Sequence, residues 1–140
     1  MSRTALLDTG PLVALVDRAD RFHAWTAASL ERLRAPLLSC QPVVAEACFL
    51  LRRLRGGPQA VLSLVERGVV RLDFDLEREV ASLSRLLTRY ANVPMALADA
   101  CLVRMSERHA SAVVITLDSD FRLYRRHGRQ AIPVVIPDGR

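Results

Sequence analysis

Apolar residues along this chain fall into short runs separated by longer stretches in which apolar and polar positions recur at helical spacing. Runs of this kind are typical of parallel strands, because helices cover both faces of such a sheet and leave no polar side. The predicted strands are residues 5–8, 36–40, 69–73, 112–117 and 132–136. The pattern therefore predicts an α/β fold with a parallel sheet.

The intervening stretches are predicted to be helices, and single Gly and Pro residues mark where they end. Asp20 is the expected N-cap of the second helix. No linker or repeat interrupts the alternation, so we expect a single domain over residues 1–140. The predicted helices are residues 12–18, 21–34, 43–54, 59–67, 76–90, 95–109 and 119–127.

Composition and charge narrow the class of protein. The chain has 140 residues, of which 51% are hydrophobic, so it has enough apolar surface for a folded core. All 20 basic residues are arginine and there are 15 acidic residues, which gives a net charge of +5. Because arginine binds phosphate through paired hydrogen bonds, this surplus favours a nucleic-acid partner.

Cysteine spacing and hydropathy indicate the cellular compartment of the protein. Cys40, Cys48 and Cys101 lie far apart, which predicts neither a disulfide framework nor a zinc site. No apolar run approaches the roughly 20 residues of a membrane span. The first residues also lack the apolar centre of a signal peptide. We therefore expect a cytoplasmic protein with no membrane contact.

Two predicted strands end directly in an aspartate, at Asp8 and Asp118. Ligands of open parallel sheets bind beyond the carboxyl ends of the strands, so both side chains enter one crevice if these strands are neighbours. A third strand ends at Asp73. For that residue and for Asp75, capping of the following helix is the favoured role.

Glu46 and Asp99 lie within predicted helices, with apolar residues three and four positions away. A buried carboxylate without a partner is costly, so we expect a cation opposite each. Taken singly, each has an ordinary alternative: Asp99 caps a helix that starts later, or Glu46 pairs with an arginine. Together with Asp8 and Asp118 they favour a shared divalent cation, and oxygen ligands select Mg²⁺ or Mn²⁺.

In their order and spacing, these acids and their neighbours resemble the motifs of the PIN-domain metallonucleases, most closely the VapC-type toxins of toxin–antitoxin pairs. The resemblance extends from about residue 5 to residue 137. Its four motifs are Leu7-Asp8-Thr9, Val43-Val44-Ala45-Glu46, Leu97-Ala98-Asp99-Ala100 and Thr116-Leu117-Asp118-Ser119-Asp120-Phe121.

The resemblance implies a three-layer α/β/α fold with a five-stranded parallel sheet of order 3-2-1-4-5. It also implies an endoribonuclease that depends on Mg²⁺ or Mn²⁺ and cleaves RNA with a metal-activated water. A small antitoxin protein and a second copy of the chain are the implied partners. The implied catalytic residues and metal ligands are Asp8, Glu46, Asp99 and Asp118, with Asp120, Thr116 and Thr9 assisting.

Arginines cluster in two places that are candidates for RNA contact. A solvated helix face is an equally open explanation of either cluster. The first cluster follows the third predicted helix and the second follows Asp118. Their members are Arg52, Arg53 and Arg55, and Arg122, Arg125, Arg126 and Arg129 around Tyr124.

Other functions remain open at this point. The chain is also compatible with a PIN-fold RNA-processing nuclease outside any toxin–antitoxin pair, or with a non-catalytic module that binds RNA or protein. A receiver domain and a dehalogenase-type phosphatase fit poorly, because both rely on a lysine and the chain has none.

Overall fold

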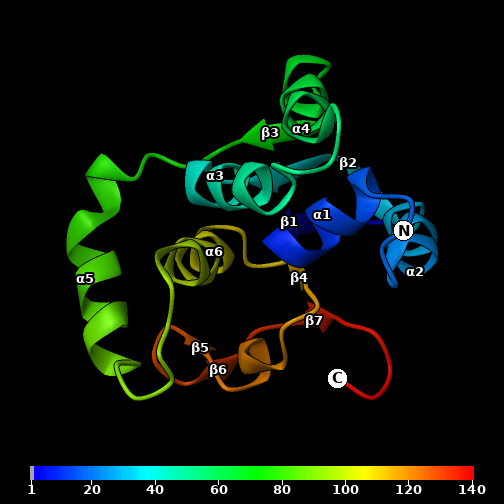
Figure 1. The fold of residues 1–140 in the computed structure, drawn as a ribbon. Coiled ribbons are helices and arrows are strands. Elements are labelled where there is room, and N and C mark those ends of the chain that lie inside the picture. The colour runs from blue at the N-terminus through cyan, green and yellow to red at the C-terminus, as the bar shows by residue number, and fades with distance from the viewer. Residues whose placement is uncertain (1) are drawn as a thin grey trace.

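A computed structural model describes residues 2–140 and contains a five-stranded parallel sheet (Figure 1). The order of its strands is β3-β2-β1-β4-β7, which confirms the predicted architecture. Two further short strands precede the last one, so the fifth predicted strand is β7. The strands of the sheet are β1 (Arg3–Leu7), β2 (Leu33–Ser39), β3 (Val70–Leu72), β4 (Val113–Ile115) and β7 (Val134–Val135).

Helices connect the strands and cover the sheet. In Figure 1, α5 stands at the outer edge of the molecule and packs against α6. No helix among residues 2–140 is long and apolar enough to cross a lipid bilayer. The α-helices are α1 (Thr9–Val16), α2 (His23–Leu30), α3 (Gln41–Leu50), α4 (Gly57–Glu66), α5 (Val80–Arg89) and α6 (Leu97–Arg108), and the 3₁₀ helices are η1 (Glu77–Glu79) and η2 (Ser119–Arg122).

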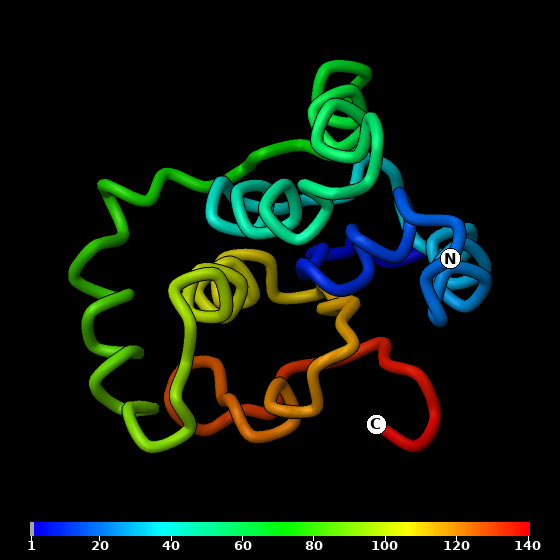
Figure 2. The backbone as a smooth tube through the Cα atoms, in the orientation of Figure 1, coloured from blue at the N-terminus to red at the C-terminus, as the bar shows by residue number. Residues whose placement is uncertain are grey.

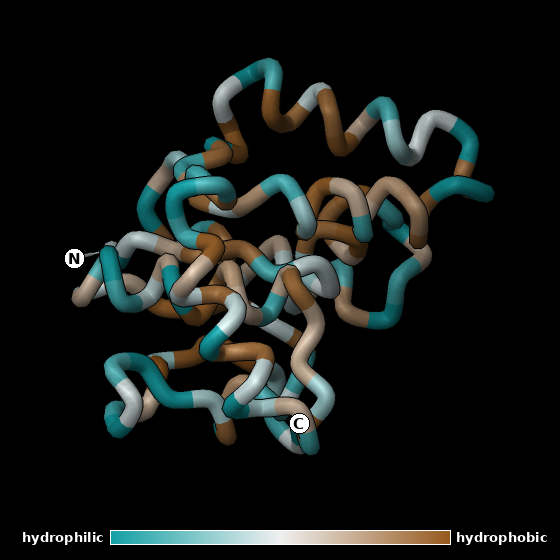
Figure 3. Tube along the Cα trace, turned by 90° about the vertical axis from the view of Figure 1, so that its left-hand side faces the viewer, coloured by the Kyte–Doolittle hydropathy of each residue, from teal (hydrophilic) through white to brown (hydrophobic). Residues whose placement is uncertain are grey.

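The core lies around β1, which pairs with β2 on one side and β4 on the other. The blue first strand is accordingly central in Figure 2. Ala5, Leu6 and Leu7 are fully buried because both faces of the strand are covered, which explains their uninterrupted apolar pattern. Hydrophilic residues lie on the turns and alternate with hydrophobic ones along the outer helices (Figure 3).

The predicted helix over residues 119–127 is wrong. Only η2 is helical, and β5 (Arg125–Arg126) then pairs with antiparallel β6 (Gln130–Ala131). His127 and Gly128 have φ values of 50° and 77°, which close the tight turn between the two strands. The backbone N–H of Arg125 donates to the Tyr90 hydroxyl, so tertiary contacts override the local helical pattern.

The predicted helix over residues 21–34 is also too long. The structure ends α2 at Leu30, and β2 already begins at Leu33 because residues Leu33 and Arg34 pair with β1. The Asp20 carboxylate does accept the backbone N–H of Phe22, but Phe22 itself occupies the N-cap position of α2.

Candidate active site

Asp8 lies at the centre of the site, directly after β1. Leu7 pairs with Ile115 of β4, and the Asp8 backbone N–H donates to the Ile115 carbonyl at 3.1 Å. This pairing brings the residues that follow β4 beside the Asp8 side chain. The two strand ends that were expected to meet are therefore neighbours.

The Asp8 carboxylate is held by neutral donors. Its Oδ1 accepts the Thr9 backbone N–H at 2.8 Å at the start of α1, and its Oδ2 accepts the Thr116 hydroxyl at 2.6 Å. Asp8 is only 6% exposed, and this burial raises its pKa to about 7 despite the two hydrogen bonds. Asp99 and Asp118 raise the pKa further through charge repulsion.

Thr116 links two of the acidic residues. Its hydroxyl donates to Asp8 and accepts the backbone N–H of Asp118 at 2.9 Å. Asp118 in turn caps η2, because its Oδ1 accepts the backbone N–H of Asp120 at 2.9 Å. The strand-end threonine therefore orients one carboxylate and the loop that carries another.

Glu46 reaches the site from α3, which packs against α1. Its Oε2 accepts the Thr9 hydroxyl at 3.1 Å. The side chain is exposed, so the expectation of a carboxylate buried in an apolar surface is wrong for this residue. Its apolar neighbours Phe49 and Leu50 are exposed as well, which explains why the helical spacing was misleading.

Asp99 lies in the first turn of α6, which begins two residues later than predicted. Its Oδ2 accepts the Ala96 backbone N–H at 3.0 Å, so the capping role considered for Asp99 is confirmed. The same oxygen accepts the Tyr124 hydroxyl at 3.3 Å. Partial burial raises the pKa of Asp99, and the charges of Asp118 and Glu46 raise it further.

The four acidic residues line one cavity of about 730 Å³. Thr9 also lines it, and Asp120 does not. Arg140 is the single cationic side chain among the described residues that line this cavity. The cavity lining is Asp8, Thr9, Gly10, Glu46, Leu50, Ala96, Asp99, Leu117, Asp118, Ser119, Gly139 and Arg140.

The charges of these acids are not balanced by ion pairs. Across residues 2–140, every ion pair involves other carboxylates, so the alternative in which Glu46 pairs with an arginine is not found. Nor do any three acidic, histidine or cysteine side chains in that range converge closely enough to enclose a metal ion as they stand. Mg²⁺ does not require such a cage, because it keeps several waters and uses one or two carboxylates plus substrate phosphates. The carboxylate oxygens of the four acidic residues, which are not in ion pairs among residues 2–140, are suitable ligands for that ion.

The structure gives the candidate arginines different environments. Arg52 and Arg53 are exposed after α3, and the Arg52 guanidinium lies 4.0 Å from the centre of the Phe49 ring. Arg125 donates to nearby backbone carbonyls, and Arg126 donates to those of Ser106 and Ala110. Arg122 is exposed beside η2. None of these five arginines lines the acidic cavity.

Three features of the site were missed from the sequence. The Tyr124 hydroxyl contact with Asp99, and the positions of Leu50 and Arg140 in the cavity lining, depend on how distant segments meet. Tyr124 drew attention only as an aromatic residue among arginines, and nothing in its local pattern indicates an acidic partner 25 residues away.

The profile of the PIN domain family matches residues 5–126. The chain belongs to this family. That match includes all four acidic residues of the cavity, and the strand order agrees with the PIN-like sheet.

Two proteins of Mycobacterium tuberculosis place this PIN domain near the VapC group. The chain is 28% identical to the ribonuclease VapC26 over 131 residues, which are 92% of this chain and 93% of VapC26. Its fold superposes on the crystal structure of VapC20, a toxin that cleaves the sarcin–ricin loop, with a TM-score of 0.71. The superposition covers 84% of this chain and 92% of VapC20 at 19% identity, so it shows the shared fold.

Proposed function

We propose that this PIN-domain protein is an endoribonuclease of the VapC type that depends on Mg²⁺ or Mn²⁺. The observation that carries the proposal is the single cavity lined by Asp8, Glu46, Asp99 and Asp118, none of which has an ion-pair partner among residues 2–140. Mutually repelling carboxylates are held together by hydroxyl and backbone donors, which orient them without neutralising them. A bound divalent cation supplies the missing charge.

Asp8 and Asp99 are the proposed direct ligands, because burial raises the pKa of both carboxyl groups. Glu46 and Asp118 hold a second ion or orient the attacking water. A divalent ion bound here lowers the pKa of its water and neutralises charge on the phosphodiester. Glu46 is exposed and has one recorded donor, which suits it to pass a proton from the site to solvent.

The net charge of +5 and the exposed arginines support RNA as the substrate. Arg52 and Arg53 follow the helix that carries Glu46, and Arg122 belongs to the 3₁₀ turn capped by Asp118. These three are the proposed phosphate contacts. Arg125 and Arg126 are weaker candidates, because their guanidinium groups already donate to backbone carbonyls.

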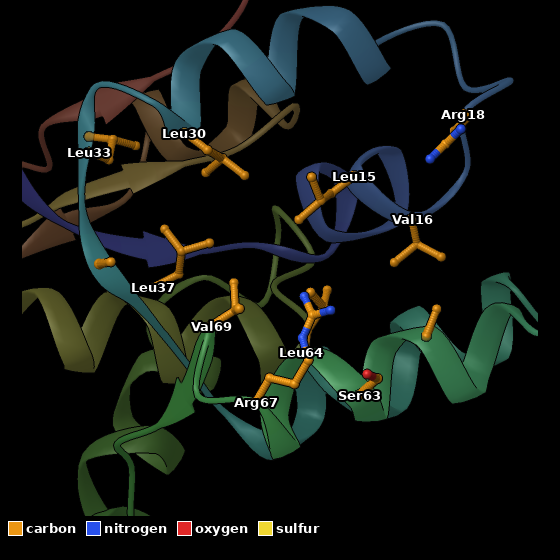
Figure 4. A pocket seen from close by; sticks show the side chains of 12 residues that line it. Leu15, Val16, Arg18, Leu30, Leu33, Leu37, Ser63, Leu64, Arg67 and Val69 are labelled. Atoms are coloured by element: carbon orange, nitrogen blue, oxygen red, sulfur yellow. The ribbon is translucent and has the colours of Figure 1, made fainter.

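We also propose a small antitoxin protein as a partner, supported by a second cavity of about 540 Å³ between α1, α2, β2 and α4. Figure 4 shows Leu15, Leu30 and Leu37 pointing into it, with Arg18 and Arg67 also part of its lining. This lining suits an amphipathic segment that brings apolar and acidic side chains. The pocket lies away from the carboxylates, so it is not the cleavage site.

A homodimer is the proposed assembly. Phe49 and Leu50 at the end of α3 and Leu54 just after it are large exposed apolar side chains, and exposed apolar surface of this kind can mark an interaction site. Sedimentation at micromolar concentration is expected to give a dimer. A monomer alone contradicts this part of the proposal.

The decisive experiment is cleavage of single-stranded RNA by the purified chain with EDTA, Mg²⁺ or Mn²⁺. Cleavage is expected only with the metals, and the fragments should carry 5′-phosphate and 3′-hydroxyl ends. RNA binding without cleavage under every metal condition favours the non-catalytic module. Cleavage that persists in EDTA contradicts the metal-dependent mechanism.

Expression of the chain in bacteria separates the toxin from a processing nuclease. Growth arrest by the wild-type protein, but not by Asp118→Asn, is expected for a toxin. Metal-dependent cleavage without growth arrest favours an RNA-processing nuclease instead. The cytoplasm is the proposed compartment in either case, since RNA is found there.

A further inference from the structure

Tyr124 lies between η2 and β5 and is the largest fully buried side chain of the domain. Its ring contacts Tyr90 and Phe121 edge to face, with both centroids 5.1 Å away. The ring is therefore held in one orientation by aromatic neighbours on two sides. Where its hydroxyl points follows from this packing.

The Tyr124 hydroxyl donates to Oδ2 of Asp99 at 3.3 Å. The Ala96 backbone N–H donates to the same oxygen at 3.0 Å. Both hydrogen bonds to the Asp99 side chain thus end on Oδ2, and within residues 2–140 no group donates to Oδ1. Asp99 lines the acidic cavity, so the oxygen without a donor is the one left for a ligand there.

We infer that Tyr124 is a positioning residue that turns the Asp99 carboxylate so that Oδ1 faces a divalent cation in the acidic cavity. The inference rests on the proposed metal-dependent function. Partners of this kind, which bind a ligand and not the metal, fix its orientation and contribute to metal affinity. Tyr124 does so from outside the cavity lining.

The neighbouring aromatic residues differ from Tyr124 in what their side chains contact. Phe121 fills an equally buried position without any polar atom. Tyr90 does carry a hydroxyl, but this group accepts the backbone N–H of Arg125 at 2.9 Å and has no acidic partner among residues 2–140. Two buried tyrosines in one cluster therefore use their hydroxyls differently: Tyr90 holds the backbone of the hairpin, and Tyr124 holds Asp99.

The β5–β6 hairpin keeps Tyr124 in place. Arg126 donates to the carbonyls of Ser106 and Ala110 at the end of α6, and Arg89 donates to the Gly128 carbonyl at 2.7 Å. These contacts tie the hairpin to α6 and α5, and α6 carries Asp99 in its first turn. The hydroxyl and the carboxylate are consequently fixed to the same rigid helix.

The test compares Tyr124→Phe with the matched control Tyr90→Phe. Both variants remove one hydroxyl from the same aromatic cluster and keep the ring. Mn²⁺ is titrated into each full-length protein without RNA, and binding is followed by calorimetry and by the electron paramagnetic resonance signal of free Mn²⁺. Asp99→Asn serves as the reference for loss of the ligand itself.

Tyr124→Phe is expected to weaken Mn²⁺ binding by about tenfold, the lower end of the range for residues that support a metal ligand. Tyr90→Phe should keep the wild-type affinity, because Arg126 and Arg89 still tie the hairpin to α6 and α5 in this variant. Excess Mn²⁺ should restore RNA cleavage by Tyr124→Phe toward the wild-type kcat, because the ligands themselves are intact.

Equal affinity of Tyr124→Phe and the wild type overturns the inference while leaving the proposed nuclease intact. An equal loss in Tyr90→Phe also overturns it, since the effect is then one of packing. A wild-type protein that neither binds Mn²⁺ nor cleaves RNA instead contradicts the proposed function itself. The two failures are therefore distinguishable.

Discussion

Asp8 and Glu79 are both buried carboxylates of this domain, but the groups around them are opposite in kind. Asp8 accepts hydrogen bonds from the neutral Thr9 N–H and Thr116 hydroxyl, and burial raises its pKa to about 7. Glu79 accepts hydrogen bonds from Arg104 at 2.6 Å and Arg108 at 2.8 Å. The Arg104 guanidinium lowers the pKa of Glu79 below its ordinary value.

The two regions also differ in what surrounds the carboxylate. Glu79 belongs to a network in which Arg104 also binds Glu107 at 3.0 Å, so its charge is matched inside the protein. Asp8 faces Asp99 and Asp118 across a cavity, and these charges repel it. A carboxylate that is oriented by neutral donors keeps its charge available to bind a metal cation. A carboxylate paired with arginine instead contributes to the stability of the fold.

The largest expected effect is loss of catalysis in Asp8→Asn. Asp8 is a proposed ligand of the metal ion, and the ion stabilises charge in the transition state by several kcal/mol. Loss of this ligand should lower the rate of RNA cleavage by about a thousandfold. Glu79→Gln is the control on the paired carboxylate and should keep wild-type kcat at a temperature where it is folded. Comparable activity losses in the two variants would contradict the distinction.

The second largest effect is expected in the pH dependence of stability, to which Asp8 and Glu79 should contribute with opposite signs. Between pH values of about 4 and 7 the folded, metal-free protein holds a proton on Asp8 that the unfolded chain releases. The free energy of unfolding should therefore fall by up to about 4 kcal/mol as the pH rises through this window. Thermal unfolding without metal measures it.

The control for this pH profile is Asp8→Asn, whose stability should change less over the same window. Glu79 gives the opposite sign because its pKa is lowered. Its contribution is present above the ordinary glutamate pKa and is lost as the pH falls through the value in the folded protein. A wild-type profile that rises between pH 5 and 8 without metal would contradict the assignment to Asp8.

Glu79→Gln should destabilise the fold by about 2 kcal/mol. This is a typical loss when charge-assisted hydrogen bonds are removed and the arginine side chains remain without their anionic partner. Arg104 is 26% exposed and Arg108 is 60% exposed, so water compensates for part of the loss. Chemical denaturation measures the change. The matched control is Asp75→Asn, which breaks an exposed pair with Arg78 and should shift stability by less than about 1 kcal/mol.

Thr116→Val tests the donor that orients Asp8. The substitution keeps the shape of the side chain and removes both the 2.6 Å bond to Asp8 and the acceptor of the Asp118 N–H. Metal affinity and cleavage should each fall by about tenfold. Thr88→Val is the control, since that hydroxyl bonds only a helix carbonyl on exposed α5; unchanged Mn²⁺ affinity in Thr116→Val would argue against the orienting role.

The smallest effect is expected for the arginines. Arg122→Ala should raise the KM for RNA by about threefold. The slope of log binding constant against log salt concentration should fall by about one, as expected for the loss of one phosphate contact. Arg78→Ala is the control, because Arg78 is also exposed but pairs with Asp75 near the Glu79 network. If both variants bind RNA equally well across salt concentrations, the contact lies elsewhere on the surface.

The sequence by itself predicted the strands of the sheet and the four acids that line the acidic cavity. Ala5, Leu6 and Leu7 read as a buried strand because a strand covered on both faces needs an apolar residue at every position. Asp8 and Asp118 stand at strand ends, which a parallel sheet brings to one edge. The first inference depends only on the local pattern, whereas the adjacency of the two strands was implied by the family resemblance and not by the pattern.

Only the tertiary structure decided the course of residues 119–131 and the surroundings of each carboxylate. The helical pattern after Asp118 yields to a hairpin because Tyr90, Ser106 and Ala110 provide hydrogen-bond partners from distant segments. For the same reason Glu79 has arginine partners and Asp99 has Tyr124, although both are acids near helix starts. Burial and pairing are properties of the packed chain, so the pKa of an acid follows from its distant neighbours and not from its place in the sequence.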